Sequence, residues 1–367
     1  MRRTLQAVVA VVIFAMLLGC GPTEKEKKVI EGLTSNMRTV CMGRFVMGIP
    51  KEGKIGGRVK LFYGLDESFK TVDVSIESPD STVASMRATL DVEAEKTDRD
   101  DKNWKTKKSM LLEYRVIDDH TIYLRKQDSI ESAAGSKHEL HLLVGTTQLV
   151  LTADSYEGVP DAGRFEPGGK VESPEQVAAR LLKIAREIRA YDTPEKAGPG
   201  YCLGPVVIDS DQDEEQGDSY MTIDKHPDLL LTAYSKGLTP DQPDDQLAQR
   251  VKDAADYSQI HVLRNGDVAL GGMRGHEWIA RVTDEHDDTL LWLVAESMRS
   301  DPALVRPYLS VNVHTGGQLV RGPDAGTYVS SSLTPKEGMA LWDAMIPSIR
   351  LRPDAIRLKG NGNWTSP

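Results

Sequence analysis

The sequence of 367 residues predicts an α+β fold with two tandem, duplicated domains, each a mostly antiparallel sheet with a few packed helices, after an N-terminal lipoprotein signal peptide. Three observations lead to this prediction. A short apolar leader ends at a cysteine, and several motifs recur at one fixed offset. Capped helices also mix with hairpin-like strands, without a regular βαβ alternation.

The leader has the parts of an export signal. Met1-Arg2-Arg3 supplies a positive start, and residues 5–18 are apolar apart from Gln6. This run is shorter than the roughly 20 residues that a membrane-spanning helix needs. It ends in Leu17-Leu18-Gly19-Cys20, which resembles the bacterial lipobox, in which the cysteine is acylated and becomes the first residue after cleavage.

We therefore expect residues 1–19 to be a lipoprotein signal peptide and residues 20–34 to be the lipidated cysteine and a polar spacer. Acyl chains on Cys20 would anchor the protein to a membrane. Gly21 stands where an aspartate is associated with retention in the inner membrane, so the resemblance favours the periplasmic face of the outer membrane. The alternative is an ordinary signal peptide with a chance cysteine.

Composition excludes several kinds of partner. Acidic residues outnumber basic ones by 55 to 45, for a net charge of −10, which argues against nucleic acid or an anionic lipid surface as the main partner. Besides Cys20, only Cys41 and Cys202 are present, and two cysteines cannot form a zinc site by themselves. We expect no cofactor and no metal.

One offset of 161 residues relates three separated pairs of motifs. Cys41 and Gly43 correspond to Cys202 and Gly204, Pro79 to Pro240, and Pro174 to Pro335. We interpret this as a tandem duplication, with domains at 35–195 and 196–367 and a Pro- and Gly-rich seam at 192–200. Cys41 and Cys202 are then either equivalent buried packing residues or the two halves of a disulfide.

Both halves show the same mixture of elements. Ser-Pro and Thr-Pro dipeptides predict N-capped helices, and Gly266 and Gly271-Gly272 are interpreted as hairpin turns. Pro347 should disturb the last helix. The predicted helices are 78–95, 174–188, 240–257 and 335–349, and the predicted strands are 110–116, 121–125, 139–144, 148–153, 229–234, 261–263, 268–270, 278–282, 290–294 and 308–313.

Catalytic signatures of the common hydrolase and nucleotide-binding types are absent, so we predict that the protein is not an enzyme. His138 and His141 suggest a metal pair, but in the predicted strand residues three apart point to opposite faces. His276 and Glu277 suggest an acid–base pair, which a turn entering the strand at Trp278 explains equally well.

Acidic runs at 98–101, 209–215 and 284–288 lie between predicted elements. A solvated loop explains each of them, and the run at 209–215 lacks the EF-hand pattern for calcium. Our functional hypothesis is that the last of its acidic residues steer a partner protein. The residues chosen are Asp211, Asp213, Glu214 and Glu215.

Four segments resemble the Tle cognate immunity proteins of type VI secretion, in their fourth class. Residues 39–50 resemble the start of the N-terminal domain of that family, and Gly198-Pro199-Gly200-Tyr201-Cys202 resembles the start of its C-terminal domain. His226-Pro227-Asp228 and the segment 271–278 resemble its hairpin region. There, Gly271 replaces an expected alanine. The resemblance covers roughly residues 35–352.

The resemblance implies a periplasmic protein that binds a cognate phospholipase effector and inhibits it stoichiometrically, with two lobes gripping the enzyme. The alternative is a two-lobed periplasmic lipoprotein that binds a small ligand or an envelope component. An unrecognised hydrolase and a scaffold lipoprotein of the secretion machine are two further alternatives.

Overall fold

The computed structural model describes residues 21–64, 70–157, 172–237, 247–254, 259–298, 307–319 and 324–356. The predicted signal peptide, Cys20 and the predicted helix start at Pro240 lie outside these residues. Within the described ranges, no helix is long and apolar enough to cross a membrane.

One antiparallel sheet of twelve strands runs through the molecule, in the order β14-β15-β16-β17-β13-β12-β3-β4-β8-β7-β6-β5. The predicted α+β class, with mostly antiparallel sheet and few helices, is confirmed. The strands of the first repeat are β3 (Lys54–Tyr63), β4 (Lys70–Ser78), β5 (Leu111–Asp118), β6 (Thr121–Ser129), β7 (Ser132–Val144) and β8 (Thr147–Tyr156). Those of the second are β12 (Glu214–Ile223), β13 (His226–Lys236), β14 (Ile260–Leu270), β15 (Met273–Thr283), β16 (Thr289–Ser297) and β17 (Tyr308–Thr315).

The duplication is visible in this strand order. Outward from the centre, the first repeat runs β3-β4-β8-β7-β6-β5, and the second runs β12-β13-β17-β16-β15-β14. The two repeats meet where β3 pairs with β12, and Arg58 lies opposite Asp218, 160 residues away. We call the half formed by β3 to β8 the N-lobe and the half formed by β12 to β17 the C-lobe.

Side-chain caps set most helix starts. Ser173 and Thr334 cap α4 (Pro174–Arg186) and α6 (Pro335–Met345), each with proline in the first turn, as predicted. The helix predicted from residue 78 begins later, as α3 (Val83–Asp100), because Thr82 is its N-cap and Ser78 ends β4. The described residues also contain the helices α2 (Glu24–Thr34) and α5 (Leu247–Ala254).

Three further details refine the predicted elements. α6 ends before Pro347, where the 3-10 turn η5 (Ile346–Ser348) follows. Gly271 and Gly272 form the predicted hairpin turn with φ of 60° and 80°, but the turn predicted at Gly266 is wrong, because β14 continues through it opposite Glu277. Most of the predicted spacer at 20–34 is the helix α2.

Each lobe takes one hairpin from the other repeat. The hairpin of β1 (Met37–Met42) and β2 (Phe45–Pro50) pairs with β20 (Arg350–Leu351), whereas β10 (Tyr201–Leu203) and β11 (Val206–Ile208) pair with β9 (Ile188–Ala190). Phe45, Met47 and Ile49 therefore lie in the C-lobe core with Trp342. Tyr201, Leu203 and Ile208 lie in the N-lobe core with Leu181. The predicted boundary at residue 195 falls between β9 and β10, and the lobes exchange hairpins across it.

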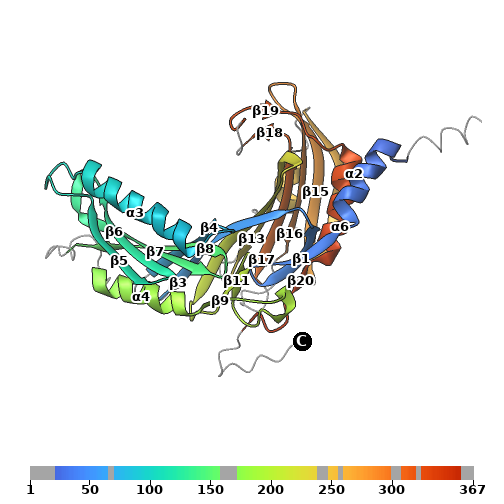
Figure 1. Cartoon of the computed structure of the whole chain (residues 1–367). Coiled ribbons are helices and arrows are strands. Elements are labelled where there is room, and N and C mark those ends of the chain that lie inside the picture. Colours follow the sequence, from blue (N-terminus) through green and yellow to red (C-terminus); the bar gives the residue numbers. More distant parts are fainter. Residues whose placement is uncertain are drawn as a thin grey trace, which may run out of the picture.

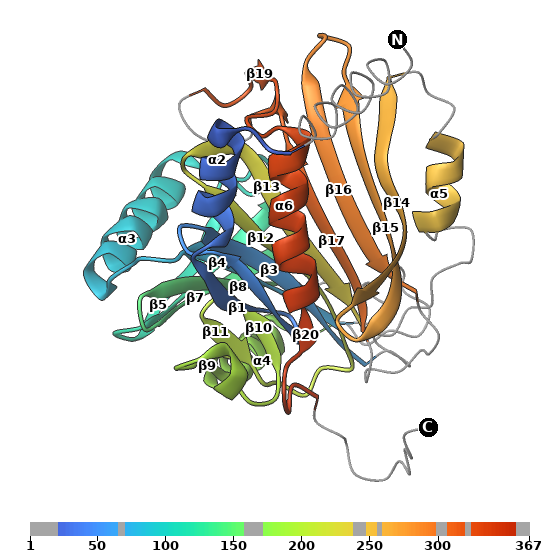
Figure 2. The ribbon, with the colours of Figure 1, turned by 90° about the vertical axis from the view of Figure 1, so that its right-hand side faces the viewer.

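The sheet has an outer and an inner face. α4 packs on the outer face of the N-lobe and α6, flanked by α2, on that of the C-lobe, whereas α3 and α5 pack on the inner face. Figure 1 shows the two wings of the sheet at an angle, with α3 and α4 on opposite sides of one wing. Figure 2 shows α2 and α6 side by side on the other wing. A small pair, β18 (Gly317–Gln318) with β19 (Tyr328–Val329), lies at the end of the C-lobe.

Candidate partner-binding surface

The centre of the inner face carries a strip of polar and aromatic side chains. Residues that pair directly across antiparallel strands point to the same face, so the register identifies the members of the strip. All of them are exposed or half-buried. The central strip consists of Arg58, Lys60, Asp73, Asp218, Tyr220, Tyr234, Lys236 and Tyr308.

Three tyrosines supply the aromatic part of the central strip. The rings of Tyr234 and Tyr308 meet edge-on with centroids 6.2 Å apart, and Lys236 Nζ lies 5.2 Å from the centroid of the Tyr308 ring. The Tyr220 ring lies across β3 over Gly56, its partner in the register, where an added Cβ would come within 2.2 Å of the ring. A side chain at this position would displace the tyrosine.

The charged members form exposed pairs. Arg58 Nε lies 3.2 Å from Asp218 Oδ2, and Lys60 Nζ lies 3.5 Å from Asp73 Oδ2. Exposed ion pairs of this kind contribute about 0–1 kcal/mol to folding, so they are free to exchange partners at small cost. Tyrosine and arginine are the residue types that dominate binding energy at protein interfaces. The three tyrosines and Arg58 are therefore the members of the central strip best suited to contact a partner protein.

The two inner-face helices flank the central strip. α3 rests on the outer strands of the N-lobe, where Met86 and Leu90 pack with Ile122 and Leu124. α5 rests on the C-lobe, where Leu247 and Val251 join a cluster with the indole of Trp278. Because these helices cover the outer strands of each wing, the surface between them is the part of the inner face that no helix of the described residues covers.

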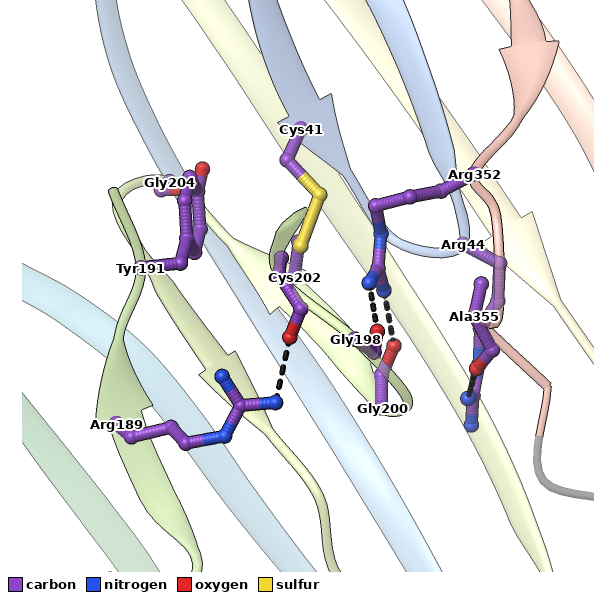
Figure 3. Close-up of a disulfide and its surroundings, with 11 residues drawn as sticks. Cys41, Arg44, Arg189, Tyr191, Gly198, Gly200, Cys202, Gly204, Arg352 and Ala355 are labelled. Atoms are coloured by element: carbon purple, nitrogen blue, oxygen red, sulfur yellow. Dashed lines mark hydrogen bonds between the residues drawn. A yellow bond between two sulfur atoms is a disulfide. The ribbon is translucent and has the colours of Figure 1, made fainter. Parts of the chain in front are cut away.

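Behind the central strip, on the outer face, the exchanged hairpins meet in a buried joint (Figure 3). Cys41 and Cys202 form a disulfide with Cα atoms 5.7 Å apart, and both are fully buried. Gly43 and Cys202 exchange two backbone hydrogen bonds of 3.0 and 2.9 Å. Of the two alternatives left open by the sequence, the structure contains the disulfide, and it links the two exchanged hairpins directly.

Two arginines complete this joint, which we call the hub. Arg44 donates through Nε and Nη2 to the two carboxylate oxygens of Glu215, both at 2.6 Å, and through Nη1 to the carbonyl of Ala355. Arg352 donates to the carbonyls of Gly198 and Gly200 (Figure 3). Burial, together with the nearby Arg44, lowers the pKa of Arg352 to about 10, which leaves it charged at neutral pH.

The acidic run chosen from the sequence is divided between structure and surface. Glu214 and Glu215 begin β12 and are only 7% and 3% exposed, so the interpretation of this end of the run as a solvated loop is wrong. The reason is that Arg44 supplies a buried counter-charge for Glu215. Asp213 accepts from the backbone N–H of Gly64 at 2.8 Å, and Asp211 pairs with Lys183 of α4 at 2.9 Å. Partner contacts by Asp211 and Asp213 stay a prediction.

The histidines singled out from the sequence do not form paired sites. His138 and His141 lie on the strand β7, and their side chains point to opposite faces, as predicted. His138 is fully buried and bonded to Tyr123 Oη and Ser155 Oγ, both at 2.7 Å. Burial lowers its pKa to about 4, so it is neutral at pH 7 and belongs to the N-lobe core.

The second candidate pair, His276 and Glu277, is divided in the same way. Consecutive residues of β15 point to opposite faces. Glu277 is buried under α6, where Trp342 Nε1 donates to it at 2.9 Å, and His276 lies within 2.6 Å of Asn265 Oδ1. Within the described part of the chain, no three His, Cys, Asp or Glu side chains come together as a metal site.

Comparison with known proteins finds one family model that matches part of the chain and one shared fold. Residues 195–354 match the Tle cognate immunity protein 4 C-terminal domain. No curated protein matches the sequence. Among solved structures, a chain of the Tle4-Tli4 complex has a TM-score of 0.58 at 18% identity, with 88% of this chain and 99% of that chain covered.

Two structures of the type VI secretion immunity protein TplEi from Pseudomonas aeruginosa share the fold at 19% identity. The apo form gives a TM-score of 0.57 over 87% of this chain and 98% of that chain. The form complexed with "L" peptide gives 0.54 over 87% and 99%. Both lobes are covered by these likenesses. The resemblance of the sequence to the Tle cognate immunity proteins is thereby confirmed.

Proposed function

We propose that this protein is an immunity protein that binds and inhibits a phospholipase effector of the Tle class through the central strip of its inner face. The main support is the combination of a Tle cognate immunity protein 4 C-terminal domain with a two-lobed fold like that of a chain in the Tle4-Tli4 complex. The surface itself supports the same proposal, because three tyrosines and one arginine lie between the two lobes, where a partner could be held.

Inhibition would be steric and stoichiometric. A partner seated on the central strip lies between α3 and α5, and two flanking lobes can exclude a lipid substrate from an enzyme held between them. The net charge of −10 would steer a basic partner toward the protein and would make the association rate depend on ionic strength.

We further propose that the protein works in the periplasm, anchored to the outer membrane through acyl chains on Cys20. The lipobox-like segment before Cys20 supports the anchor. The buried Cys41–Cys202 disulfide supports an exported location, because such bonds persist mainly in oxidising compartments.

A non-enzymatic role is part of the proposal. The sequence suggests two pairs of residues for metal binding or acid–base chemistry, namely His138 with His141 and His276 with Glu277. Each is divided between opposite faces of the sheet, so neither pair can act on one substrate. We expect the purified protein to show no lipase or esterase turnover.

One surface feature favours the rival reading, a small-ligand binder. The inner face of the C-lobe has a hollow whose walls include Leu230, Leu290, Trp292, His314 and Tyr328. Trp292 and His314 stack there with ring centroids 5.7 Å apart. Most of its lining belongs to the C-lobe, and Lys54 of β3 is the lining residue from the N-lobe, so the hollow borders the junction of β3 and β12 without being formed equally by the two repeats.

The deciding experiment is a titration of the phospholipase that we expect to be encoded beside this gene. The chain from Gly21 onward retains every described residue and is suitable as the soluble inhibitor. We expect lipase activity to vanish at about one equivalent, with a stable complex on gel filtration, while an unrelated phospholipase keeps its activity. An unaffected lipase without a complex would reject the proposal, and thermal stabilisation by a small molecule would then favour the rival.

A further inference from the structure

The first described residues of the chain are hydrogen-bonded to the folded body. Thr23 caps α2 and forms a reciprocal capping box with Glu26. Glu26 also accepts a hydrogen bond of 3.1 Å from the hydroxyl of Thr334, the N-cap of α6. Lys336 Nζ donates to the carbonyl of Gly21 at 2.9 Å. The first turns of α2 and α6 are therefore joined at the point where the described chain begins.

The rest of α2 is equally well docked. Leu33 is 5% exposed and belongs to the C-lobe core, and Val29 packs against the same core. Helix α2 lies along α6 in both views (Figures 1 and 2). Lipoproteins with a flexible spacer hang at a variable distance from the membrane, but here the segment that would serve as spacer is part of the folded body.

Covalent geometry then limits the distance between the predicted anchor at Cys20 and the folded body. Neighbouring Cα atoms are about 3.8 Å apart, so Cys20 lies within one residue of the carbonyl that Lys336 holds. Acyl chains on that cysteine enter the bilayer. If Cys20 is acylated, the first turns of α2 and α6 are therefore separated from the headgroup region only by Gly21 and the lipid linkage of the cysteine.

The same end of the C-lobe includes the turn between β15 and β16. Ser331 N donates to Thr289 O at 2.6 Å, and Ser330 Oγ donates to Asp288 at 2.7 Å, so the chain leading into α6 is tied to this turn. Figure 2 shows the tips of β15 and β16 at the end where α2 and α6 begin. The hub lies at the other end of α6, where β20 pairs with β2.

We infer that the C-lobe rests against the bilayer by this end, which we call the membrane end, so that the anchor acts as a short rigid mount instead of a tether. The inference rests on the proposed acylation of Cys20. α6 has 11 residues and is about 16 Å long, so the hub stands up to that much further from the lipid than the membrane end. The inner face is then held beside the surface on which a phospholipase works.

The test measures the distance of two labelled sites from the lipid. The full-length protein is reconstituted in phosphatidylethanolamine–phosphatidylglycerol vesicles that contain brominated lipid. A fluorophore is attached through Glu285→Cys at the membrane end or through Asp192→Cys near the hub, both exposed positions. The introduced cysteine is the one free thiol of the acylated protein, since Cys41 and Cys202 are bonded and the thiol of Cys20 carries the lipid. We expect at least threefold stronger quenching at residue 285 than at residue 192.

Two variants loosen the mount without touching the central strip. Ten Gly/Ser residues inserted between Gly21 and Pro22 keep the lipobox but add a random-coil reach of about 16–19 Å. The double change Glu26→Ala and Lys336→Ala removes the contacts between α2 and α6 at their first turns. Both should reduce quenching at residue 285 at least twofold while the protein stays membrane-bound.

Equal quenching at the two sites, or quenching at residue 285 that ignores both variants, would overturn the rigid mount. Mass spectrometry of the N-terminal peptide separates this outcome from failure of the anchor itself. An unacylated Cys20 rejects the anchor and the mount together. Lipase inhibition by the soluble chain tests the immunity function independently of both.

Discussion

The hub and the central strip use alternate residues of the same strand. Along β12, Glu215, Gly217, Ser219 and Met221 face the outer side and are buried, while Gln216, Asp218 and Tyr220 face the inner side and are half-exposed. The hub is buried, holds the disulfide, and pairs Arg44 with Glu215. The ion pairs of the strip are exposed to solvent. The period of two in a strand thus lets one segment hold the lobes together on one face and offer a binding surface on the other.

This contrast predicts that changes in the hub cost stability, whereas changes in the strip cost binding. The largest effect should come from Glu215→Ala. It leaves the guanidinium of Arg44, whose side chain is 13% exposed, without its carboxylate. We expect the free energy of unfolding in urea to fall by about 3–5 kcal/mol.

The matched control is Asp211→Ala, which removes the exposed partner of Lys183 and should cost less than about 1 kcal/mol. The apolar double change Arg44→Met with Glu215→Leu should recover most of the loss, because it removes both buried charges. A Glu215→Ala protein as stable as the control would mean that the hub does not depend on this pair.

Removal of the disulfide should cause the second-largest loss of stability. It closes a loop of 161 residues between the exchanged hairpins, and removal of a native disulfide typically costs about 2–5 kcal/mol. We expect Cys41→Ala with Cys202→Ala to shift the urea midpoint downward by a corresponding amount. Lipase inhibition should persist wherever the variant remains folded. Loss of inhibition by a fully folded variant would contradict the assignment of the hub to structure alone.

Much of the fold could be predicted because its packing motifs are local. Gly43 and Gly204 both adopt a φ near +58°, which favours glycine, so the Cys-x-Gly motif survives in both repeats and reveals the duplication. Leu181 and Trp342, matched by the same offset, are both buried core residues. The strands β3 and β12 were missed because glycines and exposed charges interrupt their apolar pattern.

The exchange of hairpins could not be predicted, because an apolar hairpin fits either of two similar cores and its own sequence does not specify which. The interpretation of Glu214 and Glu215 as part of a solvated loop was wrong for a related reason. Local charge density suggests solvent, but the partner of Glu215 is Arg44, 171 residues away. The central strip gathers from five strands, and only the pairing register brings its residues together.

The third effect concerns binding. Tyr234→Ala and Tyr308→Ala remove rings that contact each other on the half-exposed strip. Each should weaken the affinity for the lipase about 10–30-fold, measured by titration calorimetry, with little change in unfolding. Trp104→Ala, at an exposed aromatic residue outside the strip, is the control and should bind like the unaltered protein. Unchanged affinity in both tyrosine variants would remove the strip from the interface.

The smallest expected effect is on lipase binding, and it distinguishes between the two acidic surfaces proposed to contact the partner. Asp218→Lys reverses a charge on the strip beside Arg58, and Asp211→Lys reverses one beside Lys183 on the outer side. Each change alters net charge by the same amount, so long-range steering by net charge is matched between them. We expect Asp218→Lys to weaken binding about three- to tenfold, since rim charges are worth up to roughly 1 kcal/mol, and Asp211→Lys to leave it within twofold. If Asp211→Lys weakens binding more than Asp218→Lys does, the acidic run at 209–215 is the contact surface. The half-exposed residues of β12 would then face solvent without contacting the partner.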